Sequence, residues 1–167
     1  MTTLGREIHM MQNPALGAVL LWRFASAYAE AHAAHSSVPL PLLFIVLPAI
    51  LHEPTAAHIR STQQRSGLRV FASKFTEGRP SQLDLLIQLH DRALRWRSKT
   101  LEALRVAIAM GLLRIRPDGS VSAGSNSWTP NRHSKSVNRL SNVAEKMAAW
   151  CAALSLDEIA LTLHLRF

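Results

Sequence analysis

Eight histidines and one cysteine are the residues of this chain best suited to chemistry, because they suggest metal binding or nucleophilic catalysis. His32 and His35 stand three residues apart, a spacing that places two side chains on one face of a helix. A zinc site needs three or four converging ligands. The sequence has no HExxH motif and no cluster of carboxylates beside these histidines, so it favours ordinary histidines over a metal site.

The other patterns of catalytic chemistry are missing from the sequence. It has no GxSxG motif and no glycine-rich phosphate loop of the GxxxxGK[ST] or GxGxxG type. Cys151 falls on the apolar side of a predicted helix, which indicates core packing. Asp91 and Glu102 belong to different predicted helices, so they form no acid/base pair. We therefore expect that the chain is not an enzyme and that it holds no cofactor.

Positive charge is the stronger chemical signal. The chain has 19 Lys and Arg against 11 Asp and Glu, a net charge of +8. A basic stretch attracts anionic partners. Either DNA or an acidic protein could supply the negative charge that pairs with it. A solvated polar face is the third interpretation. The candidate binding residues are Arg92, Arg95, Arg97, Lys99, Arg105, Arg114 and Arg116, with a second group that contains Arg132, His133, Lys135 and Arg139.

The amino-terminal part, residues 11–60, is strongly apolar. Asn13 followed by Pro14 predicts a helix start, and the helix should run to about Ala33. Residues 38–51 carry no charge and predict a second helix bent at Pro48. This run is shorter than the roughly 20 residues of a membrane span, so we expect a partner surface instead.

Five large side chains of this part are assigned to the core or to a protein interface, and the sequence leaves that choice open. They are Trp22, Phe24, Leu43, Phe44 and Leu47, and the isolated Trp128 joins them as an interface candidate on a polar loop. Beyond this part, Pro54 predicts a short helix to about Arg60, and residues 67–75 predict an amphipathic one.

Residues 81–124 predict a winged helix. Ser81 is a candidate cap for one helix, and a turn near residues 95–98 separates it from the next, which should stop at Gly111. The sequence from Leu112 to Ala123 predicts a small hairpin around Pro117–Ser120. The expected inward residues are Leu83, Leu86, Ile87 and Leu94 on the first helix, and Leu101, Leu104, Ile108 and Leu112 on the second.

Residues 132–167 predict two carboxyl-terminal helices. Apolar residues repeat at intervals of three and four along the longer one: Val137, Leu140, Ala144, Met147, Cys151 and Leu154. Ser155 and Glu158 predict a capping box for a short last helix, after which the apolar end should pack on the protein. The fold class is thus mainly α, a single domain over residues 1–167 with a winged-helix-like core, a hairpin wing and flanking helices.

Three blocks of the sequence resemble the middle components of bacterial three-component ABC systems. The blocks are NPALGAVLLWRF at residues 13–24, LPLLFIVLPAILHEPT at 40–55 and ALRVAIAMGLLRI at 103–115. The resemblance implies a non-catalytic winged-helix subunit of an SMC-like ABC ATPase, which would itself bind the ATP. It also implies an effector such as a nuclease and possible contact with DNA. Systems of this type include Lamassu, an anti-phage defence system; the chain would bridge ATPase and effector.

A different class of function stays open beside the adaptor. A stand-alone winged-helix transcription regulator would be a symmetric homodimer, with the repeat from Val137 to Leu154 as its dimer contact. A single cysteine and the lack of an export signal predict a cytoplasmic protein under either interpretation.

Overall fold

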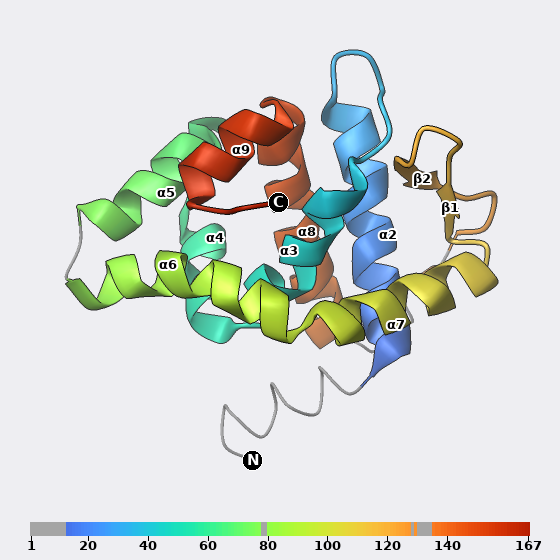
Figure 1. The fold of residues 1–167 in the computed structure, drawn as a ribbon, viewed down its shortest axis with the longest axis horizontal. Helices are drawn as coiled ribbons and strands as arrows, with labels where there is room; N and C mark the ends of the chain where they lie inside the picture. The colour runs from blue at the N-terminus through green and yellow to red at the C-terminus, as the bar shows by residue number, and fades with distance from the viewer. Residues whose placement is uncertain (1–12, 78–79, 128, 130–134) are drawn as a thin grey trace.

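The computed structural model describes residues 13–77, 80–127, 129 and 135–167, and this part of the chain is mainly helical with one two-stranded sheet (Figure 1). Buried side chains from all the helices form one hydrophobic core. The elements are α2 (Pro14–Ala31), α3 (Leu40–Ile50), α4 (Glu53–Ser61), the 3-10 helix η1 (Gln64–Ser66), α5 (Gly67–Thr76), α6 (Pro80–Arg95), α7 (Arg97–Ala109), β1 (Leu113–Ile115), β2 (Val121–Ala123), α8 (Lys135–Ala152) and α9 (Leu156–Leu163).

Helix α2 begins as the sequence predicts. The Asn13 side chain accepts a hydrogen bond from the Leu16 amide at 3.1 Å, and Pro14 occupies the first turn. The helix packs against α7 and α8 and also contacts β2. Gly17 lets α7 approach closely, since a Cβ atom at this position would lie 2.8 Å from the Ala103 Cβ.

Helix α3 is the apolar centre of the molecule. Eight of its eleven residues are buried, because α2, α4, α6, α7 and α8 all pack around it. The chain therefore covers most of its own uncharged run, so most of the expected partner surface over residues 38–51 is core, while Pro41 stays exposed and Phe44 half-buried. No single helix in the described residues is long and apolar enough to span a membrane; α3 and α4 reach that level only together, across a bend of 98°.

Helices α6 and α7 run end to end along one side of the molecule (Figure 1). Only Trp96 separates them, and backbone hydrogen bonds continue through it: its amide donates to the Arg92 carbonyl, and the Thr100 amide donates to the Trp96 carbonyl, both at 2.9 Å. The predicted turn is therefore a single residue. Helix α6 begins at Pro80, so Ser81 lies inside the helix instead of capping it.

The predicted hairpin is present. Strands β1 and β2 pair antiparallel, with Arg114 opposite Ser122. In its turn, Asp118 accepts hydrogen bonds from the Ser120 amide and hydroxyl. Val38 bridges to Val121 by two backbone hydrogen bonds of 2.8 and 2.9 Å, which ties the hairpin to the chain just before α3. Gly111 ends α7 with φ of 68°, as expected for a helix stop.

Helix α8 buries the predicted apolar repeat against α2. Leu140, Ala144, Met147 and Cys151 are all buried. The capping box of α9 is confirmed, because Ser155 and Glu158 each accept a hydrogen bond from the other's amide. After α9 the chain packs on the protein through Leu165, while half of the Phe167 side chain stays exposed.

Candidate docking interface

The basic stretch runs along α6, α7 and the hairpin, which together we call the strip. Arg95 closes α6, three cations lie on α7, and Arg114 and Arg116 lie at β1. All six side chains are exposed: Arg95, Arg97, Lys99, Arg105, Arg114 and Arg116. Lys99 pairs with Glu102 at 3.5 Å, the spacing of a surface pair within one helix. The strip therefore exposes these cations at the surface, and their binding role stays a prediction.

Arg92 is an exception within this stretch. Its side chain is only 5% exposed, and Nη1 donates a hydrogen bond of 3.3 Å to the carbonyl oxygen of Pro48. That carbonyl belongs to the last turn of α3, where helical backbone acceptors have no partner within the helix. The predicted role of Arg92 in binding DNA or an acidic partner is therefore wrong, and its guanidinium serves the core.

The same strip carries exposed apolar side chains at regular intervals. Five residues, which we call the apolar row, follow one another every seven positions: Ile87 (50% exposed), Leu94 (59%), Leu101 (45%), Ile108 (39%) and Ile115 (53%). Seven residues make about two helical turns, so the first four recur on nearly one side of α6 and α7. Isolated exposed apolar residues are ordinary, whereas a regular row on one side indicates a binding surface.

The expected inward face of these helices is therefore partly wrong. Leu86, Leu104 and Leu112 are buried as predicted, but Ile87, Leu94, Leu101 and Ile108 point outward. The face turned to the core carries Leu86, Leu89 and Leu104 together with small residues, namely Ala93, Thr100, Ala103 and Ala107. The small residues allow close contact, as between Ala103 and Gly17 of α2. The Leu83 side chain lies outside the described part.

A groove opens beside Leu94 of the row, near the junction of α6 and α7. Its volume is about 300 Å³, and α3, α6 and the residues after α9 supply its walls. We call it the tail groove; it is lined by Leu40, Pro41, Phe44, Ile45, His90, Ala93, Leu94, Arg97, Leu165, Arg166 and Phe167. Its surface is mostly apolar, with two arginines and a histidine and no Asp or Glu side chain among these residues. A smaller set around Ile108, Arg114 and Ile115 lines a second groove of about 400 Å³ at β1.

Four of the six predicted interface residues belong to the core. Trp22, Phe24, Leu43 and Leu47 are all buried within the chain, which decides between the alternatives that the sequence left open. Phe44 is half-buried and lines the tail groove, so it alone among these reaches a surface where a partner could bind. Trp128 lies outside the described residues.

The second positive group gathers at the start of α8. Lys135 and Arg139 line a groove of about 420 Å³ with Arg60 and Lys146. Arg139 is 3.5 Å from Glu53, which also pairs with Arg60, and Lys146 donates to three backbone carbonyls at the end of α4. These ion pairs and hydrogen bonds already engage much of the positive charge in this groove. Arg132 and His133 lie outside the described residues.

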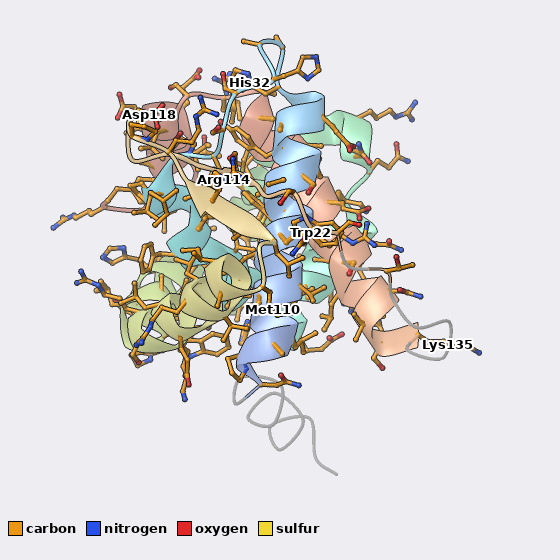
Figure 2. The ribbon with its side chains drawn as sticks, turned by 90° about the vertical axis from the view of Figure 1, so that its right-hand side faces the viewer. Trp22, His32, Met110, Arg114, Asp118 and Lys135 are labelled. Atoms are coloured by element: carbon orange, nitrogen blue, oxygen red, sulfur yellow. The ribbon has the colours of Figure 1, made fainter. Side chains whose placement is uncertain are left out.

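The two positive regions lie on different sides of the molecule. In Figure 2, Arg114 sits on the hairpin and Lys135 at the far end of α8, with α2 between them. Asp118 projects from the hairpin turn, where hydrogen bonds from Ser120 hold the pKa of its carboxyl below its ordinary value. The turn itself therefore carries a carboxylate beside Arg116, and the uncompensated cations lie along α7 and β1.

The cysteine and histidines considered for catalysis or metal binding make contacts typical of structural residues. Burial raises the pKa of the Cys151 thiol to about 12, which keeps it protonated. His32 stacks on Tyr28 with ring centroids 5.6 Å apart, and His35 bonds to the Ala29 carbonyl. In the described ranges, no group of three or more His, Cys, Asp and Glu side chains could hold a metal ion.

Comparison with family models gives a match along the whole sequence. Residues 1–167 match the model described as ABC-three component (ABC-3C) system Middle Component 3. The chain belongs to this family. Membership implies an ABC ATPase-type partner for this middle component, as the resemblance of the three sequence blocks suggests. Neither the curated proteins nor the solved structures contain a match.

Sequence reasoning missed several residues of the strip in this middle component. His90, Arg166 and Phe167 line the tail groove although they stand far apart in the sequence. No local sequence pattern predicts such a groove, because it forms only where α6 meets the residues after α9. The apolar row, in contrast, is visible in the sequence as a repeat of Ile or Leu every seven residues from 87 to 115.

Proposed function

We propose that this middle component is a non-catalytic adaptor subunit of an SMC-like ABC ATPase complex. It joins the ATPase to an effector such as a nuclease, near DNA, in bacterial anti-phage or anti-plasmid defence of the Lamassu type. The observation that carries the proposal is the match to a middle-component family along the whole chain. The strip of α6, α7 and β1 supports it, since exposed apolar and cationic side chains there offer a partner a binding surface.

In this proposal the chain contributes binding and no chemistry. ATP is bound and hydrolysed by the ATPase partner, and any bond cleavage belongs to the effector. The buried Cys151 thiol supports this division, because a protonated thiol without access to solvent makes a poor nucleophile. The adaptor transmits a change in the ATPase to the effector by keeping or releasing contacts, and it acts in the cytoplasm.

DNA contact and the winged helix belong to the same proposal. The order of helix, helix and hairpin from α6 to β2 is that of a winged helix. However, a helix-turn-helix pair crosses at about 90–120°, whereas α6 and α7 run end to end (Figure 1). The winged-helix assignment stays a prediction, with Lys99 and Arg105 as its groove-facing cations and Arg114 and Arg116 on the wing.

The alternative, a homodimeric transcription regulator, loses its expected dimer contact. That contact was the repeat from Val137 to Leu154 on α8, but Leu140, Ala144, Met147 and Cys151 are buried inside the chain. A residue packed against α2 is not available to a second copy. The adaptor is therefore the better supported of the two functions.

Purification with the partner tests the adaptor function. The tagged chain is co-expressed with the ABC ATPase and the effector of its own system, treated with nuclease and recovered by affinity. Mass spectrometry and light scattering then identify the species. A complex of defined ratio that survives the nuclease is the expected result. Recovery of the chain alone, or as a homodimer bound to nucleic acid, would overturn the adaptor function.

A further inference from the structure

We propose that the outer side of α6 and α7 binds an acidic amphipathic helix of the ATPase partner. The apolar row receives the apolar side of that helix, and the tail groove accepts one of its large side chains. This inference rests on the proposed adaptor function and adds the chemistry and the shape of the bound segment. Three features of the strip carry it: the spacing of the row, the groove beside Leu94 and the cations around the α7 part of the row.

The spacing of the row matches a helix as occupant. Leu94, Leu101 and Ile108 are separated by two helical turns each, or about 10 Å along the axis. A second helix that lies alongside in coiled-coil fashion also presents apolar side chains with a seven-residue period. The nearly unbroken course of α6 and α7 keeps the row straight enough for such a contact, as the hydrogen bonds through Trp96 indicate.

The tail groove provides the deeper contact that a flat row lacks. Leu94 belongs to both, so the groove adjoins the row near the junction of α6 and α7. Phe44 and Phe167 supply aromatic walls on either side of it. Binding energy in protein interfaces concentrates where a large side chain enters such a pocket. An apolar residue of the bound helix placed opposite Leu94 would fill the groove.

The charge around the α7 part of the row favours an acidic occupant, whereas Asp84 and Asp91 flank Ile87 at the α6 end. Arg97 and Arg105 stand four residues before and after Leu101, so both flank it on the same side of α7. Arg166 adds a cation at the tail groove, and Arg114 adds one near Ile108. Each of these four arginines is exposed. Carboxylates on the edges of an amphipathic helix would meet them, and exposed arginines beside apolar residues are typical of protein interfaces.

The same features disfavour the other occupants. A second copy aligned parallel would bring its own arginines against Arg97 and Arg105, and like charges repel. An antiparallel copy would bring Asp84 and Asp91 toward these arginines instead, so the crosslinking test below includes a second copy among its outcomes. A nucleic-acid backbone would pair with the arginines but would leave Leu101 and Ile108 without an apolar surface to bury. The combination of a cationic edge with an apolar centre fits an acidic helix better than either.

Photo-crosslinking within the complex tests this contact directly. Benzoylphenylalanine is placed at Leu101 in the full chain, and at Leu161 of α9 as a control, because Leu161 is also exposed at 78% but lies off the strip. The complex is assembled with the purified ATPase of the system and irradiated. We expect a crosslink from position 101 to an ATPase segment that is acidic and has apolar residues at helical spacing, and none from position 161.

Two variants of opposite charge at position 101 provide a second test, with ATPase affinity as the measured quantity. Leu101→Asp should weaken ATPase binding at least about tenfold, whereas Leu101→Lys, which loses the same apolar contact, should weaken it less because it faces carboxylates. Arg105→Glu should also weaken binding, while Arg65→Glu on η1 makes the same change in net charge and should not. Circular dichroism establishes that each variant is folded.

The outcomes separate this proposal from the adaptor function. If the ATPase binds but position 101 crosslinks to nothing, to a second copy or to nucleic acid, the docking proposal is overturned and the adaptor function stands. Equal binding of the Asp and Lys variants at position 101 would overturn the acidic nature of the occupant. If the unchanged chain does not bind the ATPase, the adaptor function fails and this proposal fails with it.

Discussion

Arg92 of α6 donates a hydrogen bond to the Pro48 carbonyl oxygen of α3 across 3.3 Å, in the interior of the protein. Pro48 sits in the last turn of a helix whose final carbonyls lack backbone partners, and the buried guanidinium supplies one of the missing donors. The contact joins the apolar central helix to the helix that carries the apolar row. An arginine from the most basic stretch of the chain is thus part of its core.

Replacement of Arg92 by methionine should lower the free energy of unfolding by about 2 kcal/mol, because the buried carbonyl loses a charged donor while the apolar stem is kept. Urea denaturation checks this value. Arg95→Met is the matched control, since Arg95 is exposed on the same helix and its loss should change stability by less than about 0.5 kcal/mol. Equal stability of the two variants would contradict the structural role of Arg92.

Enlargement of Gly17 should separate α2 from α7. A Cβ atom there would meet the Ala103 Cβ at 2.8 Å and a Leu47 methyl at 3.2 Å, so Gly17→Val should destabilise the protein by about 2 kcal/mol through overpacking. Thermal denaturation measures the loss. Ala15→Val, at an exposed position of the same helix, should cost only its helix propensity, roughly 0.6 kcal/mol. A Gly17→Val protein as stable as the control would show that this approach is not tight.

Stability should fall in acid partly through Glu158. Hydrogen bonds from the Ser155 amide and hydroxyl, with Arg69 nearby, hold the pKa of Glu158 below its ordinary value of 4.5. A lowered pKa means that the unfolded chain binds more protons, so this contribution is present above the ordinary value and is lost as the pH falls through the folded one. Denaturation curves from about pH 7 to about pH 3 should be less pH-dependent for Glu158→Gln. Asp157→Asn, in the same first turn, should keep the slope more nearly intact.

Cys151 should resist thiol reagents in the folded protein. The side chain is fully buried and its pKa is raised to about 12, so little thiolate exists and none is accessible. Labelling by an aromatic disulfide reagent should therefore follow global unfolding, with one thiol titrated at once in denaturant. Rapid labelling of the native chain would mean that α8 opens locally, and that the contact between α8 and α2 is less stable than its burial implies.

The sequence by itself predicted the helices and the hairpin, because their signals are local. Asn13 with Pro14, the Ser155 and Glu158 capping box, and Gly111 act on backbone groups within one turn of themselves, so their effect requires no knowledge of neighbours. The repeat on α8 and the positive strip were predicted for the same reason. Family resemblance added the ATPase-type partner and the expectation of an adaptor function.

Only the tertiary structure decided which sides of these elements are buried. Periodicity places Leu94 and Leu101 on one side of α6 and α7 but does not say whether that side meets the core. The core took the side on which Leu86, Leu89 and Leu104 stand beside the small residues Ala93, Ala103 and Ala107, and the small Ala103 lets α2 come close. The opposite side stayed outside as the apolar row. The burial of Arg92 and the tail groove arise likewise from contacts between distant segments, which no local pattern encodes.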